Sequence, residues 1–394
     1  MNIAYFSDTF YPRIDGVVIT LLNFIQLLAE KGHKIKLYVP NYKNIKEREF
    51  HENISIERYT SFKLIGYPDF RVVIPVLLKI KRSIRIFKPD IIHFHTPGPL
   101  GLIGINCAEQ YKIPLIGTYH TYLTDFLVCI SPNKKIDESD KIDLPKKIVW
   151  KLSNYYHNKC DLVTAPSESM RKELKKNGLK AKVVFLSNGL ALDAFSSKEK
   201  YNKKAKLLHV GRLSFEKNVD VIIKSVAILK KEFPDIRLDI VGDGPALKSL
   251  KLMIQKLELE KNIRFLGRKE HIKLNKIYKE HDIFITASTV ETQGVVILEA
   301  MASGLPIIGV KKLAIPDLVK NNVNGYVTKP FDEQEMSEKI RILYKDSKLR
   351  EDFGKNSAEL VKGHDVKKVI EKLEKIYFEY KIIKNKNIDF YKSI

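Results

Sequence analysis

The stretch STVETQGVVILEAMASGLPII, residues 288–308, indicates how the chain folds. It begins at the end of an apolar run, DIFITAS, that is typical of a buried strand, and it closes on a second such run, LPIIGV. Between the two runs, after Gly294, apolar residues recur at helical spacing. A strand, a helix and a second strand in this order predict a parallel α/β sheet. Two carboxylates, Glu291 and Glu299, lie in this apolar stretch, and packing alone does not explain them.

The same alternation extends in both directions from this stretch. After residue 204, further strands are expected in KLLHVGR, RLDIVGDG, IRFLGR and GYVTK. The first half repeats the pattern in NIAYFS, KIKLYVP, DIIHFHT, PLIGTYHT, LVTAPS and KVVFLSNG. The chain is therefore predicted to be α/β, with two doubly wound, Rossmann-like domains at 1–192 and 205–368, joined by the polar stretch 193–204.

Composition and charge narrow the possible partners and the compartment. The 394 residues carry a net charge of +22, which predicts attraction to an anion such as a nucleic acid, an acidic lipid surface or a phosphorylated ligand. The odd number of cysteines leaves one of the three unpaired in any disulfide scheme and favours reduced thiols in the cytosol. Neither a secretory leader nor a bilayer-spanning apolar run is expected.

Two loops that follow predicted strands carry the residues suited to a phosphate. Arg212 and Lys217 in GRLSFEK offer a guanidinium fork and a mobile ammonium group to a diphosphate. A helix that begins after Gly294 would add its free N–H groups. Side chains of a helix tilt toward its N-terminus, so Glu299 would lean back to hold a ribose, with Glu291 beside the phosphate end. The alternatives are a solvated basic loop, a helix-dipole partner and a surface acid.

Taken together, these features resemble the retaining, GT-B-fold glycosyltransferases of family 4. The marker of that family is Glu-X7-Glu, which stands here among Ser288, Glu291, Gly294, Glu299, Ala300, Met301, Gly304 and Pro306. Other motifs follow in family order over the whole chain: SDTFYPRIDGVV, GTYHT, SNGL, GRLSFEKN, VGDGP and FLGR. The resemblance implies two Rossmann-like domains that face each other across a cleft, and a terminal helix, 369–394, that returns to the first domain.

The resemblance also implies a role for each matching residue. Gly16 and Val17, in the loop before the first helix, would offer backbone N–H groups to the donor diphosphate. The cations Arg212 and Lys217 would bind the same phosphates. Backbone groups at Gly267 and Arg268 would frame the base, and Glu299 would hold the ribose. The donor sugar and its phosphate would meet Glu291 and the amides of Gln293, Gly294 and Val295. His120, in GTYHT, would lie beside the anomeric carbon, although a core histidine at a strand end is the alternative. His93 and His95 fit that core alternative.

The chain departs from the family pattern in two places. SNGLALDAF replaces the common Pro-Asn-Gly-Ile-Asp form, so Asp193 carries no assignment. Gln293 replaces the frequent phenylalanine and gives ETQG, a form similar to that of the branch that glycosylates lipids such as diacylglycerol.

The chemistry that we expect needs no metal. Positive groups placed at the leaving diphosphate lower the barrier to breaking the anomeric bond. The chain contains no Asp-X-Asp sequence, the usual metal-binding pair of the other glycosyltransferase class, and no cofactor is expected. The resemblance implies retention of the anomeric configuration, with the departing phosphate taking the acceptor's proton.

Two basic stretches could account for part of the charge. RVVIPVLLKIKRSIRIFK, residues 71–88, interleaves six cations with apolar residues at near-helical spacing, as expected for a helix that lies on an anionic bilayer. An ordinary helix with a solvated lysine face is the alternative. Residues 124–152 mix apolar patches with lysines and include the only tryptophan, Trp150. None of the familiar nucleic-acid motifs occurs, so no nucleic acid partner is expected.

The sequence therefore predicts a cytoplasmic enzyme that is peripheral on the inner face of the cell membrane. It would move a hexose from a nucleotide-sugar, with UDP-hexose favoured, to a lipid acceptor such as diacylglycerol. The same catalyst with a polysaccharide or soluble acceptor is the alternative. A non-catalytic basic protein that binds membrane or nucleic acid is a further one.

Overall fold

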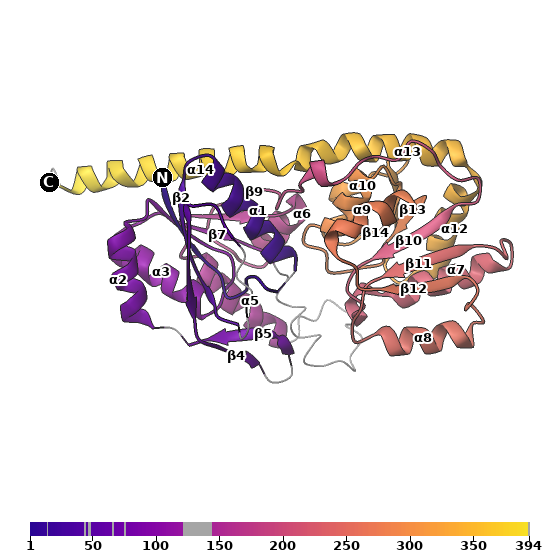
Figure 1. Cartoon of the computed structure of the whole chain (residues 1–394), viewed down its shortest axis with the longest axis horizontal. Helices are drawn as coiled ribbons and strands as arrows, with labels where there is room; N and C mark the ends of the chain where they lie inside the picture. The colour runs from indigo at the N-terminus through magenta and orange to yellow at the C-terminus, as the bar shows by residue number, and fades with distance from the viewer. Residues whose placement is uncertain are drawn as a thin grey trace. The chain divides into compact units, whose positions relative to one another are not determined.

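Contacts divide the chain into two compact units, which are described separately (Figure 1). The first comprises Met1–Gly189 with Val366–Ile394, and the second Leu190–Asp365. This computed structural model describes the whole chain except residues 14, 43–44, 46–48, 65–66, 75, 121–143 and 393–394. At 63–70, 144–146 and 385–394 it describes the backbone only, where it describes the residue at all. Within the described part, no helix is both long and apolar enough to cross a membrane.

Seven parallel strands form the sheet of the first unit, in the order β3-β2-β1-β6-β7-β8-β9. They are β1 (Asn2–Phe6), β2 (Lys34–Pro40), β3 (Ile54–Tyr59), β6 (Ile91–Phe94), β7 (Leu115–Thr118), β8 (Leu162–Ala165) and β9 (Val183–Phe185). The central strands are short apolar runs that are buried throughout, as parallel strands covered on both faces must be. A small antiparallel hairpin, β4 (Ser61–Leu64) and β5 (Tyr67–Val73), stands apart from this sheet.

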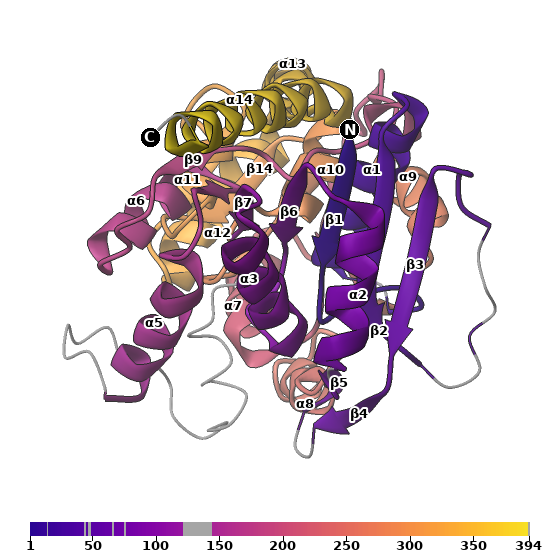
Figure 2. The same cartoon turned by 90° about the vertical axis from the view of Figure 1, so that its left-hand side faces the viewer.

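Helices cover both faces of this sheet. On one face, α2 (Leu77–Phe87), α3 (Pro99–Tyr111) and α5 (Leu144–His157) lie side by side, as Figure 2 shows, and share one hydrophobic core. On the opposite face, α1 (Gly16–Glu30) packs against α14 (Val366–Lys392). The short helix α6 (Glu168–Lys176) packs on β8 and β9.

The basic stretch 71–88 is not one helix, and that part of the prediction is wrong. Arg71 belongs to strand β5, where its Nε donates to Ser61 Oγ at 2.6 Å and its guanidinium lies 5.0 Å from the Tyr42 ring centroid. The helix α2 begins only at Leu77. Periodicity alone could not find this boundary, because the strand end and the helix share one apolar and basic composition.

The terminal helix α14 packs on the first unit. Val369, Ile370, Leu373 and Tyr377 are buried along one side of it. The Tyr377 hydroxyl lies 2.7 Å from the Tyr5 hydroxyl, a contact between residues 372 positions apart in the chain. The sequence predicted a helix from residue 369 that returns to the first domain. In the structure the helix begins at Val366 and belongs to the first unit.

The second unit contains a six-stranded parallel sheet in the order β12-β11-β10-β13-β14-β15. Its strands are β10 (Lys206–Val210), β11 (Arg237–Val241), β12 (Ile263–Gly267), β13 (Ile283–Ile285), β14 (Ile307–Val310) and β15 (Gly325–Thr328). The helices are α7 (Val219–Lys230), α8 (Leu247–Lys256), α9 (His271–Lys279), α10 (Val295–Ala302), α11 (Ile315–Leu318), α12 (Glu333–Lys345) and α13 (Ser347–Leu360). One continuous hydrophobic core fills this unit.

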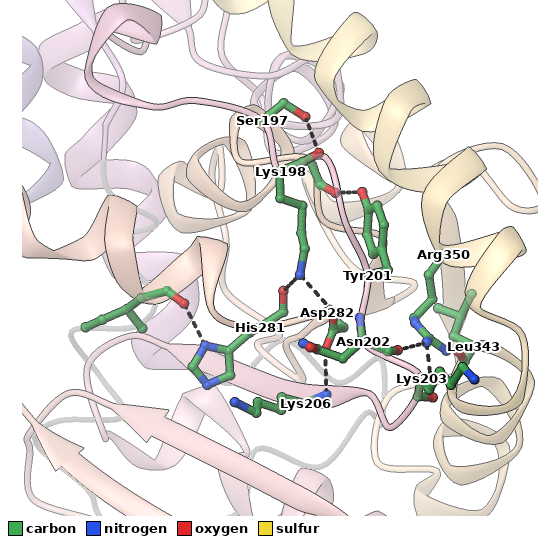
Figure 3. Close-up of polar contacts among 12 residues, drawn as sticks. Ser197, Lys198, Tyr201, Asn202, Lys203, Lys206, His281, Asp282, Leu343 and Arg350 are labelled. Carbon is green, nitrogen blue, oxygen red and sulfur yellow. Dashed lines mark hydrogen bonds and ion pairs between the residues drawn. The ribbon is translucent and has the colours of Figure 1, made fainter.

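The polar stretch 193–204, expected to join two domains, is attached to the second unit (Figure 3). Lys198 is buried there and its Nζ donates to Asp282 Oδ1 at 2.8 Å. Asp282 also accepts from the backbone N–H of Asn202 and of Lys206, at 3.0 and 2.9 Å. The buried guanidinium of Arg350 donates to the Asn202 carbonyl. The chain passes between the units outside this stretch, at Gly189–Leu190 and at Asp365–Val366.

Each sheet has one point where the strand order reverses, and in the second unit Arg212, Lys217 and Glu291 follow the two strands at this point. In the first unit the reversal lies between β1 and β6, and in the second between β10 and β13. Loops that leave neighbouring strands in opposite directions diverge at such a point, which is where open α/β sheets bind ligands.

Candidate active site

Lys217 and Glu291 form an ion pair at the reversal point of the second unit. Lys217 ends a short turn after β10, and Glu291 lies in the loop after β13. The Lys217 Nζ lies 2.6 Å from Glu291 Oε1, and both side chains are largely shielded from solvent. Burial raises the pKa of Glu291, but the charge and hydrogen bond of Lys217 and a hydrogen bond from Ser288 outweigh it and hold that pKa below its ordinary value. The pair is charged, so a cation is held at this point.

The helix α10 begins directly after Gly294, as the sequence predicted. Gly294 has φ +81°, a backbone conformation that favours glycine, and a Cβ there would lie 2.9 Å from Ile297 Cδ1. No side chain caps this helix end, and Val295 is its first residue. The first N–H groups of a helix have no intrahelical partners and attract anions. Gln293, just before them, is buried.

Glu299 is buried one turn into α10, and two residues of α9 hold its carboxylate. The Tyr278 hydroxyl donates to Glu299 Oε2 at 2.8 Å, and His271 Nε2 lies 3.0 Å from Oε1. The hydrogen bond to Glu299 raises the pKa of His271, against the opposing effect of burial. Sequence reasoning did not single out His271 or Tyr278. Their seven-residue separation, which puts both on one helix face, was the available signal.

Arg212, Gly267 and Arg268 also follow strands at the carboxyl edge of this sheet. Arg212 is exposed in the loop after β10. Gly267 ends β12 with φ +69°, a conformation in which a side chain would be strained. Gly267 and Arg268 are exposed, two strands from β10 in the sheet order. The backbone at this point is open to a ligand, as base recognition by main-chain groups requires.

Gly16 and Val17 were expected in a loop before the first helix, and that detail is wrong. They are the first two residues of α1 itself. Asp15 caps the helix and accepts from the Val18 N–H at 2.9 Å. A Cβ on Gly16 would meet no atom within 4 Å. The free N–H groups at this position therefore come from a helix N-terminus, a better anion site than an irregular loop.

His120 lies two residues beyond β7 in the first unit and is buried. Its Nε2 lies 2.7 Å from Nδ1 of His95, and Asn188 also hydrogen-bonds the His120 side chain. Burial lowers the pKa of His120 to about 3, so the ring is neutral at physiological pH. His93 and His95 are buried as well, in agreement with their assignment to the core.

Comparison with known proteins identifies the family. Residues 14–194 match Glycosyltransferase Family 4, and residues 192–360 match Glycosyl transferases group 1. The alpha-monoglucosyldiacylglycerol synthase of Streptococcus pneumoniae is 30% identical over 339 residues, which cover 82% of this chain and 74% of that protein. The chain belongs to the family 4 glycosyltransferases. The enzyme of the same name from Acholeplasma laidlawii is 28% identical over 324 residues, which cover 78% of this chain and 80% of that protein.

Solved structures agree on the fold. The structure of HepE from Anabaena in complex with UDP superimposes with a TM-score of 0.75 at 19% identity, and covers 96% of this chain and 100% of its own. This glycosyltransferase therefore has the GT-B fold, with one parallel sheet in each of two domains. It acts on a nucleotide-sugar, and the residues described above are candidates for binding it.

Proposed function

We propose that this glycosyltransferase transfers a hexose, with retention and without a metal, from UDP-hexose to a membrane lipid such as diacylglycerol, on the inner face of the cell membrane. The observation that carries the catalytic part is the half-buried Lys217–Glu291 ion pair at the strand reversal that precedes the N-terminus of α10. The two relatives described above are named as alpha-monoglucosyldiacylglycerol synthases, and these names support a lipid acceptor. The UDP in the HepE structure supports the donor.

The charges suit the departure of a diphosphate. As the bond between the anomeric carbon and the diphosphate oxygen breaks, negative charge grows on that oxygen, where Arg212, Lys217 and the first N–H groups of α10 would stabilise it. The acceptor hydroxyl oxygen forms the new bond to the anomeric carbon on the same face, and its proton moves to the departing oxygen. Glu291 keeps Lys217 charged and in place before the donor binds. The carboxylate of Glu299, oriented by Tyr278, would accept the ribose hydroxyls.

The outer face of α2 supports the membrane part of the proposal. Leu78 and Ile86 are 81% and 71% exposed there. Arg82, Arg85 and Lys88 are exposed beside them, and none pairs with a carboxylate among the described residues. Exposed apolar side chains among unpaired cations are typical of a helix that rests on an anionic bilayer. Each such cation contributes roughly 1 kcal/mol at that surface.

Flotation with anionic and neutral vesicles tests this assignment. We expect the R82E/R85E variant to float with anionic vesicles much less than the native enzyme, and to lose transfer to diacylglycerol in vesicles. Donor hydrolysis without lipid should be retained. The matched control is K248E/K251E, the same charge change on exposed lysines of α8 in the second unit. Equal loss of flotation in both variants would show a general charge effect and no α2 surface.

The helix α5 offers a second surface, in the described part of the stretch 124–152. Lys147 and Lys151 border a groove of about 630 Å³ there, with Trp150 and Tyr155 also in its lining. Residues 124–143 lie outside the described part of the chain. If K147E/K151E abolishes flotation and the α2 variant does not, the membrane contact is α5. If native enzyme floats with neither vesicle and glycosylates a polysaccharide or soluble acceptor, the alternative acceptor class is correct.

A further inference from the structure

His95 and His120 form a ring pair at the carboxyl ends of two neighbouring strands. His95 follows β6 directly, and His120 follows β7 by two residues. Their rings are stacked, with centroids 4.9 Å apart and an interplanar angle of 20°. The hydrogen bond between His95 Nδ1 and His120 Nε2 is 2.7 Å long. His95 is fully buried and His120 nearly so, so solvent does not compete for this bond.

The surroundings decide which nitrogen carries the shared hydrogen. Burial lowers the pKa of both rings well below the ordinary value, so each ring is neutral and carries one hydrogen. The other nitrogen of His95, Nε2, is buried and has no partner among the described residues. An orphaned buried N–H group is rarer than an orphaned acceptor. The hydrogen of His95 is therefore on Nδ1, and it donates to Nε2 of His120.

The same bond sets the state of His120. Because its Nε2 accepts from His95, the single hydrogen of the neutral His120 ring is on Nδ1. Asn188 also interacts with this ring and favours its protonated form. The bond at Nε2 therefore holds the His120 ring in one tautomer and one orientation.

Two further rings pack against the ring of His95. The His93 ring lies 4.3 Å from it and the Tyr5 ring 5.2 Å, both measured between centroids. His93 is anchored in turn, with Nδ1 at 2.6 Å from the Tyr377 hydroxyl of α14 and Nε2 at 2.7 Å from Thr118 Oγ1. The terminal helix therefore supports the position of a ring that lies far from it in the sequence.

We propose that His95 is a positioning residue of the transfer reaction, which fixes His120 as a neutral Nδ1–H ring and prevents it from acting as a base. This rests on the proposed place of His120 beside the anomeric carbon. The only basic lone pair of such a ring is on Nε2, where it already accepts from His95, so the ring does not take the acceptor's proton and leaves it to the departing diphosphate. His120 then contributes shape and a fixed ring edge to the pocket for the transferred sugar.

Two isosteric substitutions separate this role from simple packing. The amide nitrogen of an asparagine can occupy the place of His95 Nδ1, whereas a glutamine amide reaches the place of Nε2. We expect H95N to keep kcat within about threefold of the native enzyme, and H95Q and H95F to lower it by at least about tenfold, because small displacements of an active-site group are costly. The KM for the donor, bound by the other unit, should change little. Thermal melting identifies any variant that has failed to fold.

Long-range ¹H–¹⁵N spectra of the histidine-labelled protein test the tautomer without any use of activity. The His120 signals, assigned with H120Q, should show hydrogen on Nδ1 in the native enzyme and in H95N, and a mixture of tautomers in H95F. Hydrogen on Nε2 in the native enzyme would overturn the inference. So would equal kcat in H95N and H95Q when both fold. If the tautomer depends on His95 but H120Q transfers sugar normally, the proposed place of His120 fails, and with it the positioning role.

Discussion

The two units of this glycosyltransferase differ in the polar side chains that they bury, although the first unit also buries one carboxylate, that of Asp8. The first unit uses neutral groups in a chain of hydrogen bonds, which runs through Tyr5, His93, Thr118, Thr164 and Tyr377. The second unit uses charges, which include Lys198 with Asp282, Lys217 with Glu291, and the guanidinium of Arg350. Burial of a neutral polar group costs little once it is hydrogen-bonded, whereas a buried charge needs a partner as well.

The difference matches the parts of the reaction that we assign to each unit. A nucleotide-sugar brings its charge at the diphosphate, where the second unit holds a cation ready. The sugar and acceptor bring neutral hydroxyl groups, and the neutral rings of the first unit do not disturb their protons. An ion pair also holds Lys217 in its charged form, whereas burial holds the histidines in their neutral form. Under the proposed function, charged groups of the second unit and neutral groups of the first would therefore serve the two halves of the substrate pair.

The largest effect is expected from the buried ion pair of the second unit. D282A should lower the free energy of unfolding of this unit by about 3–5 kcal/mol, because Lys198 would stay buried without its carboxylate. Calorimetry measures the loss. D235A is the matched control, since Asp235 pairs with Lys204 at 2.7 Å while both side chains are more than 70% exposed. Solvent screens such an exposed pair, so it contributes little to stability, and equal losses in both variants would contradict the contrast.

Acid should destabilise the first unit before the second. The pKa values of His93, His95, His120 and His157 are lowered by burial, to about 3 for His120 and about 4 for His157. Unfolded histidine takes up protons near its ordinary pKa of 6.5, so the stability of the folded unit is complete above that pH and is lost as the pH falls toward the folded values. Each such group loses about 1 kcal/mol between roughly pH 6.5 and 5.5, so the four amount to about 4 kcal/mol.

The only tryptophan makes this measurable, since Trp150 lies in the first unit. In denaturant titrations followed by its fluorescence, the midpoint of unfolding of the first unit should be lower at acidic pH. Calorimetry also detects the second unit, whose unfolding causes no fluorescence change, and the melting temperature of that unit should shift less. In the second unit, among the described histidines, only His209 has a clearly lowered pKa, and that of His271 is raised. Equal acid sensitivity of the two units would break the comparison.

Loss of the catalytic cation should reduce turnover without unfolding the protein. K217A is expected to lower donor turnover by at least about two orders of magnitude, which is about 2.7 kcal/mol of transition-state stabilisation. E299A should cause a loss of similar size through the ribose. K224A is the control for K217A, because Lys224 forms an exposed pair with Asp220 on α7. Normal hydrolysis and transfer by K217A would remove Lys217 from the site.

The smallest effect is expected from the neutral network. Y377F removes one hydroxyl that bonds Tyr5 and His93, and should lower the stability of the first unit by about 1–2 kcal/mol. F378A, at the half-exposed neighbouring position, should cost less. The Trp150 transition reports both variants. A loss in Y377F as large as that in D282A would show that neutral and charged networks are equally costly to break.

The sequence by itself determined the α/β class, both parallel series of strands, and the family through its Glu-X7-Glu stretch. It also placed the start of α10 after Gly294, because apolar residues recur at helical spacing directly after that glycine. It missed β3, β4 and β5, where polar residues interrupt the strand pattern, and it placed Gly16 and Val17 just outside the helix that they begin.

Only the tertiary structure decided which side chains meet across long separations. Tyr5 and Tyr377 contact each other from the two ends of the chain, Tyr278 turns toward Glu299, and Lys198 finds Asp282. The pKa values follow from these contacts, because burial and a nearby charge decide whether a group is neutral or ionised. Neither can be read from the residues that are local in sequence. Local spacing sets the secondary structure, whereas the protonation state of the site depends on the packing of distant segments.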